Sequence, residues 1–129
     1  MNNQEIAKIF YEIASYLEIE GVAFKPYAYQ RAAMGLEGLE EDVREIYDRG
    51  GLKELEEIPG VGENIALKIE EYLKTGKIET YLRLKKKNPF NLEELTSVEG
   101  LGVRKSKILY QQLKIKNLKD LEKAAKAHK

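Results

Sequence analysis

The sequence predicts an all-α protein, a bundle of short helices with no sheet, and two observations carry this prediction. Apolar residues recur at intervals of three and four along most of the chain, which is the spacing of a helix with one buried face. No run of β-branched residues alternates with polar ones, as a half-buried strand would require. At 129 residues the chain is long enough to bury a core in one or two small domains.

The first predicted helix covers residues 3–19, where five apolar residues form one stripe: Ile6, Ile9, Phe10, Ile13 and Leu17. An asparagine at position 2 or 3 can cap its start, and Gly21 ends it. Pro26 favours the first turn of a second helix. The buried face of that helix is expected to carry Tyr29, Ala32, Ala33 and Leu36.

A third helix is predicted at 40–48 and stops at Gly50-Gly51. Six further helices are expected at 52–57, 63–74, 77–86, 92–97, 104–113 and 118–127. The segment 88–91 is the predicted domain boundary, because Pro89 disfavours helix at Asn88 and Asn91 can cap the helix that follows. We therefore expect one domain at 1–88 and a second at 89–129.

Composition excludes several classes of function. The chain has no Cys and a single His, His128, which excludes a disulfide framework, a thiolate metal site and a Ser-His-Asp triad. No apolar run approaches the length of a membrane span, and the N-terminus lacks the apolar region of a signal peptide. A soluble, cytoplasmic protein is the expectation.

Charge is unevenly distributed along the chain. The 22 basic and 22 acidic residues sum to zero, which taken whole argues against a nucleic-acid partner. Residues 1–60, however, contain 6 Lys or Arg and 13 Asp or Glu, whereas residues 61–129 contain 16 and 9. The second half is therefore basic, which indicates an anionic contact surface, with ordinary solvated helix faces as the alternative.

An internal repeat is the strongest signal in the sequence. Residues 55–62 (LEEIPGVG) recur 40 residues later as 95–102 (LTSVEGLG), and each copy is followed by an amphipathic helix. Two glycines around an apolar residue favour a tight turn anchored to the core. Its amides, together with the N-terminus of the next helix, can hold a phosphate without reading sequence. This pattern is the helix-hairpin-helix motif, expected at 55–74 and 95–113; two plain turns between helices are the alternative.

The two hairpins differ in their nearest charges. The second hairpin is followed by three cations, Arg104, Lys105 and Lys107. Its affinity for a DNA backbone should therefore fall steeply as the salt concentration rises. Glu63 and Asn64 follow the first hairpin, and a carboxylate there suits the helix dipole but repels a phosphate. The first hairpin is expected to be the weaker electrostatic anchor. The glycines of both, Gly60, Gly62, Gly100 and Gly102, are the predicted phosphate-binding turns.

Beyond the repeat, residues 59–77 (PGVGENIALKIEEYLKTGK) closely resemble the N-terminal lyase domain of family X DNA polymerases. Residues 24–33 (FKPYAYQRAA) resemble the Ala-Tyr-x-x-Ala-Ala helix of that domain. Residues 98–102 and 115–121 are similar to the adjoining second hairpin region. The resemblance extends from about Gln4 to Ala125 and implies the helix-hairpin-helix fold throughout.

The resemblance implies binding at the 5′ side of a DNA gap and a 5′-deoxyribose-phosphate lyase that acts through a Schiff-base lysine. By position in the motif, Lys68 matches the nucleophile, Tyr29 lines the lyase pocket and Lys25 binds the 5′-phosphate. Two of these residues also have a purely structural interpretation: Lys68 as a surface lysine and Tyr29 as a core aromatic. Asn64 occupies the position of a second phosphate-binding lysine of the family.

Two further departures from the family affect the same chemistry. Glu56 stands where the family has a lysine, and Leu67 replaces a glutamate considered for proton abstraction. With Asn64, these changes weaken the expected 5′-phosphate site and the elimination step. The resemblance also implies K+ or Na+ held by main-chain carbonyls, with no other cofactor. The expected ligands are residues Glu56, Ile58 and Val61 at the first hairpin and Thr96, Val98 and Leu101 at the second.

The function expected from the sequence is sequence-independent binding of gapped, nicked or 5′-phosphorylated DNA in base-excision-type repair, by a monomer that makes no membrane contact. In family X polymerases the carboxylates of nucleotidyl transfer lie in a palm subdomain, and the resemblance implies that this chain has no room for it. The chain is thus expected to be part of a family X polymerase or a free-standing relative. A location at the nucleoid of a prokaryote is expected with it. Two alternatives remain: a non-catalytic DNA-binding or scaffolding module, and a helical protein-interaction domain.

Overall fold

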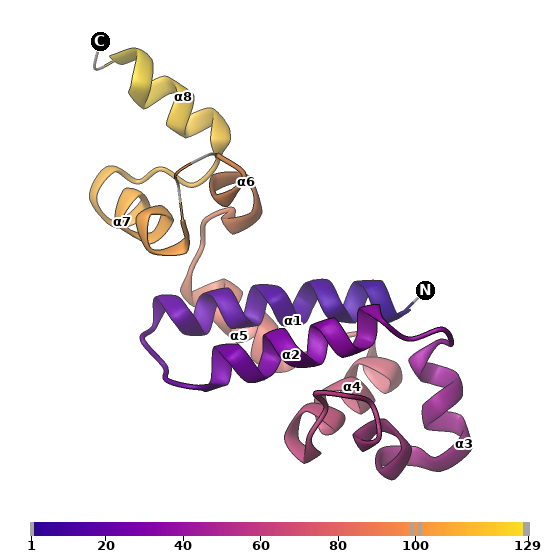
Figure 1. Cartoon of the computed structure of the whole chain (residues 1–129). Helices are drawn as coiled ribbons and strands as arrows, with labels where there is room; N and C mark the ends of the chain where they lie inside the picture. The colour runs from indigo at the N-terminus through magenta and orange to yellow at the C-terminus, as the bar shows by residue number, and fades with distance from the viewer. Residues whose placement is uncertain (1, 99, 101, 128–129) are drawn as a thin grey trace.

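The computed structural model describes residues 2–98, 100 and 102–127, and these residues form eight helices and no β-strand. The predicted all-α class is thereby confirmed. Helices α6, α7 and α8 lie at one end of the molecule and α3 and α4 at the other, with α1, α2 and α5 between them (Figure 1). Leu101, a predicted cation ligand, and His128 lie outside the described residues.

The core is built on the antiparallel pair α1 (Asn2–Ile19) and α2 (Lys25–Glu37), which form the most extensive helix–helix interface (Figure 1). Four of the five residues of the predicted stripe of α1 are buried, with Ile6, Phe10 and Ile13 fully inaccessible to solvent, and Ile9 is half-buried. On α2 the facing residues Ala32 and Ala33 are also fully buried, and their small side chains allow the two helices to approach closely. Within the described residues, no helix is long and apolar enough to cross a membrane.

Helix α3 (Val43–Glu56) begins three residues later than predicted because Asp42 caps it, accepting a 2.9 Å hydrogen bond from the Arg44 amide. The buried Asn3 side chain ties α1 to this start, since its Oδ1 accepts from the Val43 amide at 2.8 Å. Gly51, with φ of 67° and ψ of −147°, interrupts α3. The two helices expected on either side of Gly50-Gly51 are therefore the two arms of one kinked element.

Helix α4 (Glu63–Thr75) ends at Gly76, which adopts the left-handed conformation typical of a helix C-cap. Helix α5 (Glu79–Lys87) begins two residues later than expected, because the Glu71 carboxylate accepts a 2.9 Å hydrogen bond from the Glu79 amide at its start. Tyr47 of α3 donates a 2.6 Å hydrogen bond to Glu70 of α4. These bonds join α3, α4 and α5.

The remaining helices are α6 (Leu92–Thr96), α7 (Val103–Leu113) and α8 (Leu118–Ala127). Asn91 caps α6 as predicted, accepting a 3.0 Å hydrogen bond from the Glu94 amide. The segment before it is fixed by the buried Asn88, whose side chain donates to the Leu84 carbonyl at 2.9 Å. The chain thus turns at the predicted boundary, although the division into two domains stays a prediction.

Candidate nucleic-acid interface

The first hairpin joins α3 to α4 through a turn closed by a 3.0 Å hydrogen bond from the Val61 amide to the Ile58 carbonyl. Both of these side chains are buried, which anchors the turn as the sequence predicts. Gly60 has a φ of 86°, in the region that favours glycine. Gly62 is exposed, and no side chain caps the start of α4 after it. The first amides of α4 are thus available to a ligand.

Helix α2 holds this hairpin by direct backbone contact. A Cβ atom on Gly35 would lie 2.0 Å from the Pro59 carbonyl oxygen, and one on Gly60 would lie 2.6 Å from the Arg31 carbonyl oxygen. Two glycines, one on each side, are therefore needed for the two backbones to touch. The position of the first hairpin is set by α2 as much as by its own turn.

The second hairpin precedes α7 and has the same local design. Gly100 has a φ of 81°, and Gly102 precedes α7 with no side chain capping the helix start. The fully buried Ser106 donates a 3.0 Å hydrogen bond to the Gly102 carbonyl, which secures the first turn of α7. A Cβ on either glycine would meet no atom within 4 Å. The second hairpin is thus open around its glycines, where the first is in contact with α2.

The cations predicted for the second hairpin are arranged in different ways. Arg104 is exposed on the first turn of α7. Lys105, also exposed, donates a 3.3 Å hydrogen bond from its ammonium group to the Gly100 carbonyl. Lys107 is half-buried, and its ammonium group instead donates to the Ile19 carbonyl of α1 at 3.4 Å. Arg104 and Lys105 therefore flank the hairpin, whereas Lys107 is directed to the end of α1.

The surroundings of the first hairpin are more acidic. A groove of about 410 Å³ is lined by Ala28, Arg31 and residues 56–62, in which Glu56 and Glu57 are exposed. The Arg31 guanidinium lies over the Tyr27 ring, 5.7 Å from its centre, so its charge is partly directed to that ring. Glu63 and Asn64 are exposed on the first turn of α4. The charge difference predicted between the hairpins is thus present on the folded surface.

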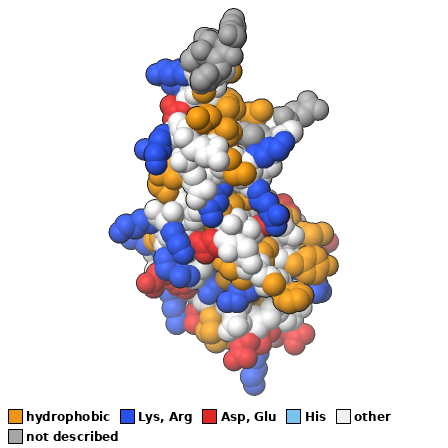
Figure 2. Space-filling model, turned by 90° about the vertical axis from the view of Figure 1, so that its left-hand side faces the viewer, with side chains coloured by type: hydrophobic (Ala, Val, Ile, Leu, Met, Phe, Trp, Pro, Cys, Tyr) orange, Lys and Arg blue, Asp and Glu red, His pale blue; other side chains and the backbone are white. Residues whose placement is uncertain are grey.

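Figure 2 shows the left-hand side of Figure 1, the side on which α7 and the α1–α2 turn lie. Lys and Arg side chains are spread over its middle beside an apolar patch, and acidic side chains are more frequent in its lower half. Lys25 is exposed at the start of α2 on the α1–α2 turn. Phe24, which precedes it, is 89% exposed and has a φ of 66°, a strained value for a residue with a Cβ. The sequence did not single out Phe24; an exposed aromatic ring there can stack on an unpaired base.

The two residues matched to lyase chemistry lie in different environments. Lys68 is half-buried on α4, two turns after the first hairpin. Tyr29 is only 7% exposed and packs edge-to-face on Phe10, with ring centres 5.5 Å apart. Burial raises the pKa of Tyr29 to about 12, so its hydroxyl stays protonated at neutral pH. Tyr29 therefore has the environment of a core aromatic, which agrees with the purely structural interpretation of this residue.

The predicted main-chain cation sites fall on the two hairpin turns. Of their carbonyls, that of Ile58 already accepts the hydrogen bond that closes the first turn. No group of three or more His, Cys, Asp or Glu side chains that could hold a metal occurs among the residues with described placement. Binding of K+ or Na+ at the hairpins stays a prediction, because its ligands would be backbone oxygens.

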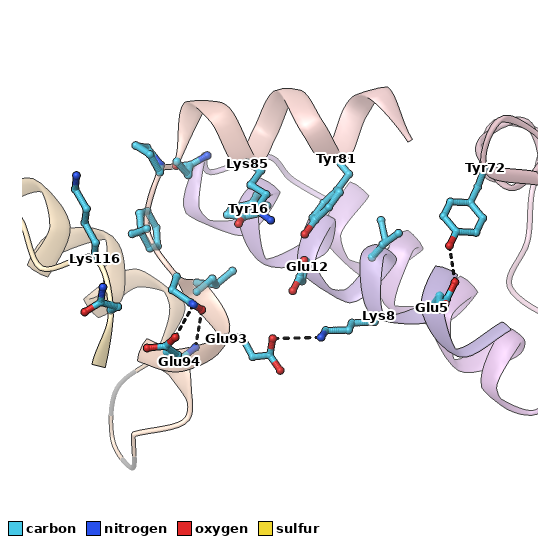
Figure 3. Close-up of a pocket in the computed structure, with 17 residues that line it drawn as sticks. Glu5, Lys8, Glu12, Tyr16, Tyr72, Tyr81, Lys85, Glu93, Glu94 and Lys116 are labelled. Atoms are coloured by element: carbon cyan, nitrogen blue, oxygen red, sulfur yellow. Dashed lines mark hydrogen bonds and ion pairs between the residues drawn. The ribbon is translucent and has the colours of Figure 1, made fainter. Parts of the chain in front are cut away.

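A cleft that the sequence did not predict lies between α1, α5 and the segment leading into α6. Its volume is about 950 Å³, and polar side chains meet across it (Figure 3). Lys8 forms a 3.3 Å ion pair with Glu93, and Tyr72 donates a 2.6 Å hydrogen bond to Glu5 (Figure 3). These partners are more than 60 residues apart in the chain, so no local pattern could have indicated them.

Comparison with known proteins places these features in a family context. Residues 1–78 match the family model of the helix-hairpin-helix domain. The whole chain is 31% identical, over 130 residues, to the N-terminal part of the DNA polymerase/3′-5′ exonuclease PolX of Bacillus subtilis (strain 168). The aligned region makes up 22% of that relative, so the chain spans about a fifth of its length. The predicted resemblance to family X polymerases is thereby confirmed.

Proposed function

Because this chain belongs to the helix-hairpin-helix domain family, we propose that it binds gapped or nicked DNA through the phosphate backbone, without reading sequence. The observation that carries this proposal is the pair of uncapped helix starts after glycine turns, at Gly62 and Gly102. Amides at such starts bind phosphate oxygens through hydrogen bonds and the helix dipole. The likeness to a DNA polymerase/3′-5′ exonuclease supports DNA as the source of the phosphates.

In this proposal the second hairpin binds the DNA backbone more tightly than the first. Arg104 and Lys105 add positive charge beside its amides, whereas Glu56, Glu57 and Glu63 oppose a phosphate at the first hairpin. Each phosphate neutralised by a cation contributes a slope of about −0.9 to the dependence of log K on log salt. Binding should therefore depend steeply on salt, and mostly through the second hairpin.

A matched pair of glycine variants tests the contribution of each hairpin to DNA binding. Gly62 and Gly102 have φ of −97° and −84°, and a Cβ on either would meet no atom within 4 Å, so both tolerate a side chain. Gly102→Val should block the approach of a phosphate and weaken binding to labelled gapped DNA by more than about tenfold, a loss comparable to that of good charge-assisted contacts. Gly62→Val should weaken binding less.

The measurement is fluorescence anisotropy over a salt series, with an intact duplex as the comparison. Absence of binding by the unaltered chain at about 0.05 M salt, where phosphate contacts are strongest, would contradict the proposal. Equal affinity of Gly102→Val and the unaltered chain would remove the second hairpin from the interface. A preference for gapped over intact duplex is the expected result for a module that binds at a DNA gap.

We further propose that the chain acts as a 5′-deoxyribose-phosphate lyase, with Lys68 as the nucleophile. Its amine would attack the C1′ aldehyde and release water, forming an imine. Transfer of the C2′ proton to water and cleavage of the C3′–O bond would then free the 5′-phosphate end of the DNA, and hydrolysis of the imine would return the amine of Lys68. Support comes from the half-buried position of Lys68 on the helix that leaves the first hairpin.

The exposed Leu67 and Asn64 favour a slow elimination, because neither side chain can accept the C2′ proton as a carboxylate would. Borohydride trapping on an incised abasic substrate separates imine formation from elimination. The adduct should form with the unaltered chain and with Lys74→Ala, an exposed lysine on the same helix, but be lost in Lys68→Ala. DNA binding without any adduct would favour the alternative function, a non-catalytic DNA-binding module.

A further inference from the structure

The C-terminal end of α1 is negatively charged and is contacted by lysines from two other helices. The ammonium group of Lys107, on α7, donates to the Ile19 carbonyl at 3.4 Å. The ammonium group of Lys87, the last residue of α5, lies 3.4 Å from Oε2 of Glu20. Free carbonyls at a helix end carry partial negative charge, and the Glu20 carboxylate adds a full charge beside them. Two cations are thus held at one point of the junction between α1, α5 and α7.

The Glu20 carboxylate is poorly satisfied in this position. Its Oε2 atom is buried and accepts no hydrogen bond from any residue that the structure describes, because the Lys87 ammonium is close enough for an ion pair but not aligned for a hydrogen bond. A desolvated carboxylate oxygen without a hydrogen bond costs free energy, and a partly exposed ion pair returns little of it. Stabilisation of the fold therefore does not account for the charge on Glu20.

The same carboxylate opens onto a cavity of about 460 Å³ that also contacts Lys87, Lys107, Tyr110 and Gln111. Two of these residues, Tyr110 and Gln111, belong to α7, the helix that starts at the second hairpin. Lys107, on the second turn of α7, is the lining residue nearest in sequence to the second hairpin, so the cavity lies along the helix that begins at the stronger of the two proposed phosphate sites. A carboxylate at this place is of the same charge as the phosphate expected to bind nearby.

We propose that Glu20 is an internal competitor of DNA phosphate for Lys87, so that the free protein withholds one cation from the interface. This inference rests on the proposed DNA binding. The Lys87 ammonium is paired with Glu20 in the free chain, and this pairing opposes its contact with a phosphate. Glu20 thereby lowers DNA affinity and reduces the steepness of its salt dependence.

The expected effect of removing this competitor follows from counterion release. One additional phosphate contact changes the slope of log K against log salt by about −0.9, which corresponds to about eightfold tighter binding at ~0.1 M salt. Glu20→Gln keeps the shape of the side chain and removes its charge. It should therefore bind gapped DNA about eightfold more tightly, with a slope steeper by about 0.9.

A matched control separates this effect from the change in net charge. Glu18 is exposed on the same last turn of α1, so Glu18→Gln alters the net charge equally without touching the cavity. Binding of labelled gapped DNA is measured by anisotropy over a salt series for both variants. Glu18→Gln should change the affinity by less than about twofold, as expected for an exposed charge screened by salt.

Substitutions of Lys87 test the inference from the other partner. Lys87→Gln alone should change affinity by less than about twofold, because this cation is already withheld. In the Glu20→Gln background, the same substitution should abolish the whole gain. Equal affinities of Glu20→Gln and Glu18→Gln, or a gain that persists in the double variant, would overturn the inference while DNA binding stands. Failure of the unaltered chain to bind would instead remove the proposed function, and this inference with it.

Discussion

The contact between α2 and the first hairpin allows a sharp prediction for Gly35→Ala. In an ordinary helix interior this substitution stabilises, because alanine exceeds glycine in helix propensity by about 0.8–1 kcal/mol. At Gly35 the new Cβ would lie 2.0 Å from the Pro59 carbonyl oxygen. Since ordinary contact begins at 3.4 Å, that oxygen must move by about 1.4 Å, and it belongs to the backbone of a buried turn.

The magnitude follows from these opposing effects. Overpacking a well-filled site costs about 1–3 kcal/mol, and a displacement forced on backbone atoms falls at the upper end of this range. Subtracting the gain in propensity leaves an expected loss of about 1–2 kcal/mol in the free energy of unfolding. The displaced hairpin should also weaken DNA binding, because the orientation of the first amides of α4 depends on it.

The assay is urea-induced unfolding followed by circular dichroism, with Gly38→Ala as the control. Gly38 ends α2 in a right-handed conformation, and its Cβ would meet the Met34 carbonyl oxygen at an ordinary 3.6 Å. Alanine there should be neutral or stabilise by about 0.4–1 kcal/mol. Should Gly35→Ala prove as stable as Gly38→Ala, the close contact between α2 and the first hairpin would not exist as described.

Two further predictions concern buried polar groups. Burial raises the pKa of Tyr16 and Tyr29 to about 12 from an ordinary value of 10.0, so ionisation favours the unfolded chain between about pH 10 and 12. At about 1.4 kcal/mol for each pKa unit, each of these two groups should lower the free energy of unfolding by about 2–3 kcal/mol across that window. Tyr29→Phe should remove the contribution of Tyr29 from urea unfolding at alkaline pH, and an unchanged pH dependence would contradict this. Asn3→Ala removes 2.8 Å hydrogen bonds to the Val43 amide and the Glu41 carbonyl, and should cost about 2–4 kcal/mol in thermal or urea unfolding. The exposed Gln4→Ala should be neutral, and a similar loss in both variants would mean that burial of Asn3 is not the cause.

The helices and turns were predictable because their signals are local. The repeat of 55–62 at 95–102 predicted both hairpins, and Asn91 predicted the start of α6. What could not be predicted depends on packing between distant segments. Gly35 looks in the sequence like a weak point within a helix, and only the folded chain reveals the Pro59 backbone against it.

The candidate site was predicted unevenly for the same reason. The glycines and cations follow from sequence spacing, but the direction of a long side chain does not. Lys107 follows the second hairpin in the sequence and was expected at a phosphate, yet its ammonium is directed to the Ile19 carbonyl. Glu20 carries no motif at all, and its relation to Lys87 arises only because the ends of α1 and α5 meet.

The two hairpins share a turn but differ in what supports each one, and this difference favours separate roles for them in the proposed function. The first is held by backbone contact with α2 at Gly35 and Gly60, which fixes its geometry but leaves acidic side chains around it. A fixed turn at the start of the helix that carries Lys68 suits chemistry that requires one orientation of a sugar. The second hairpin has open space around Gly100 and Gly102, and cations lie beside it. This arrangement suits binding of a DNA phosphate at any sequence. Changes in salt should therefore act on affinity through the second hairpin, and changes at Gly35 should act on the rate of imine formation through the first.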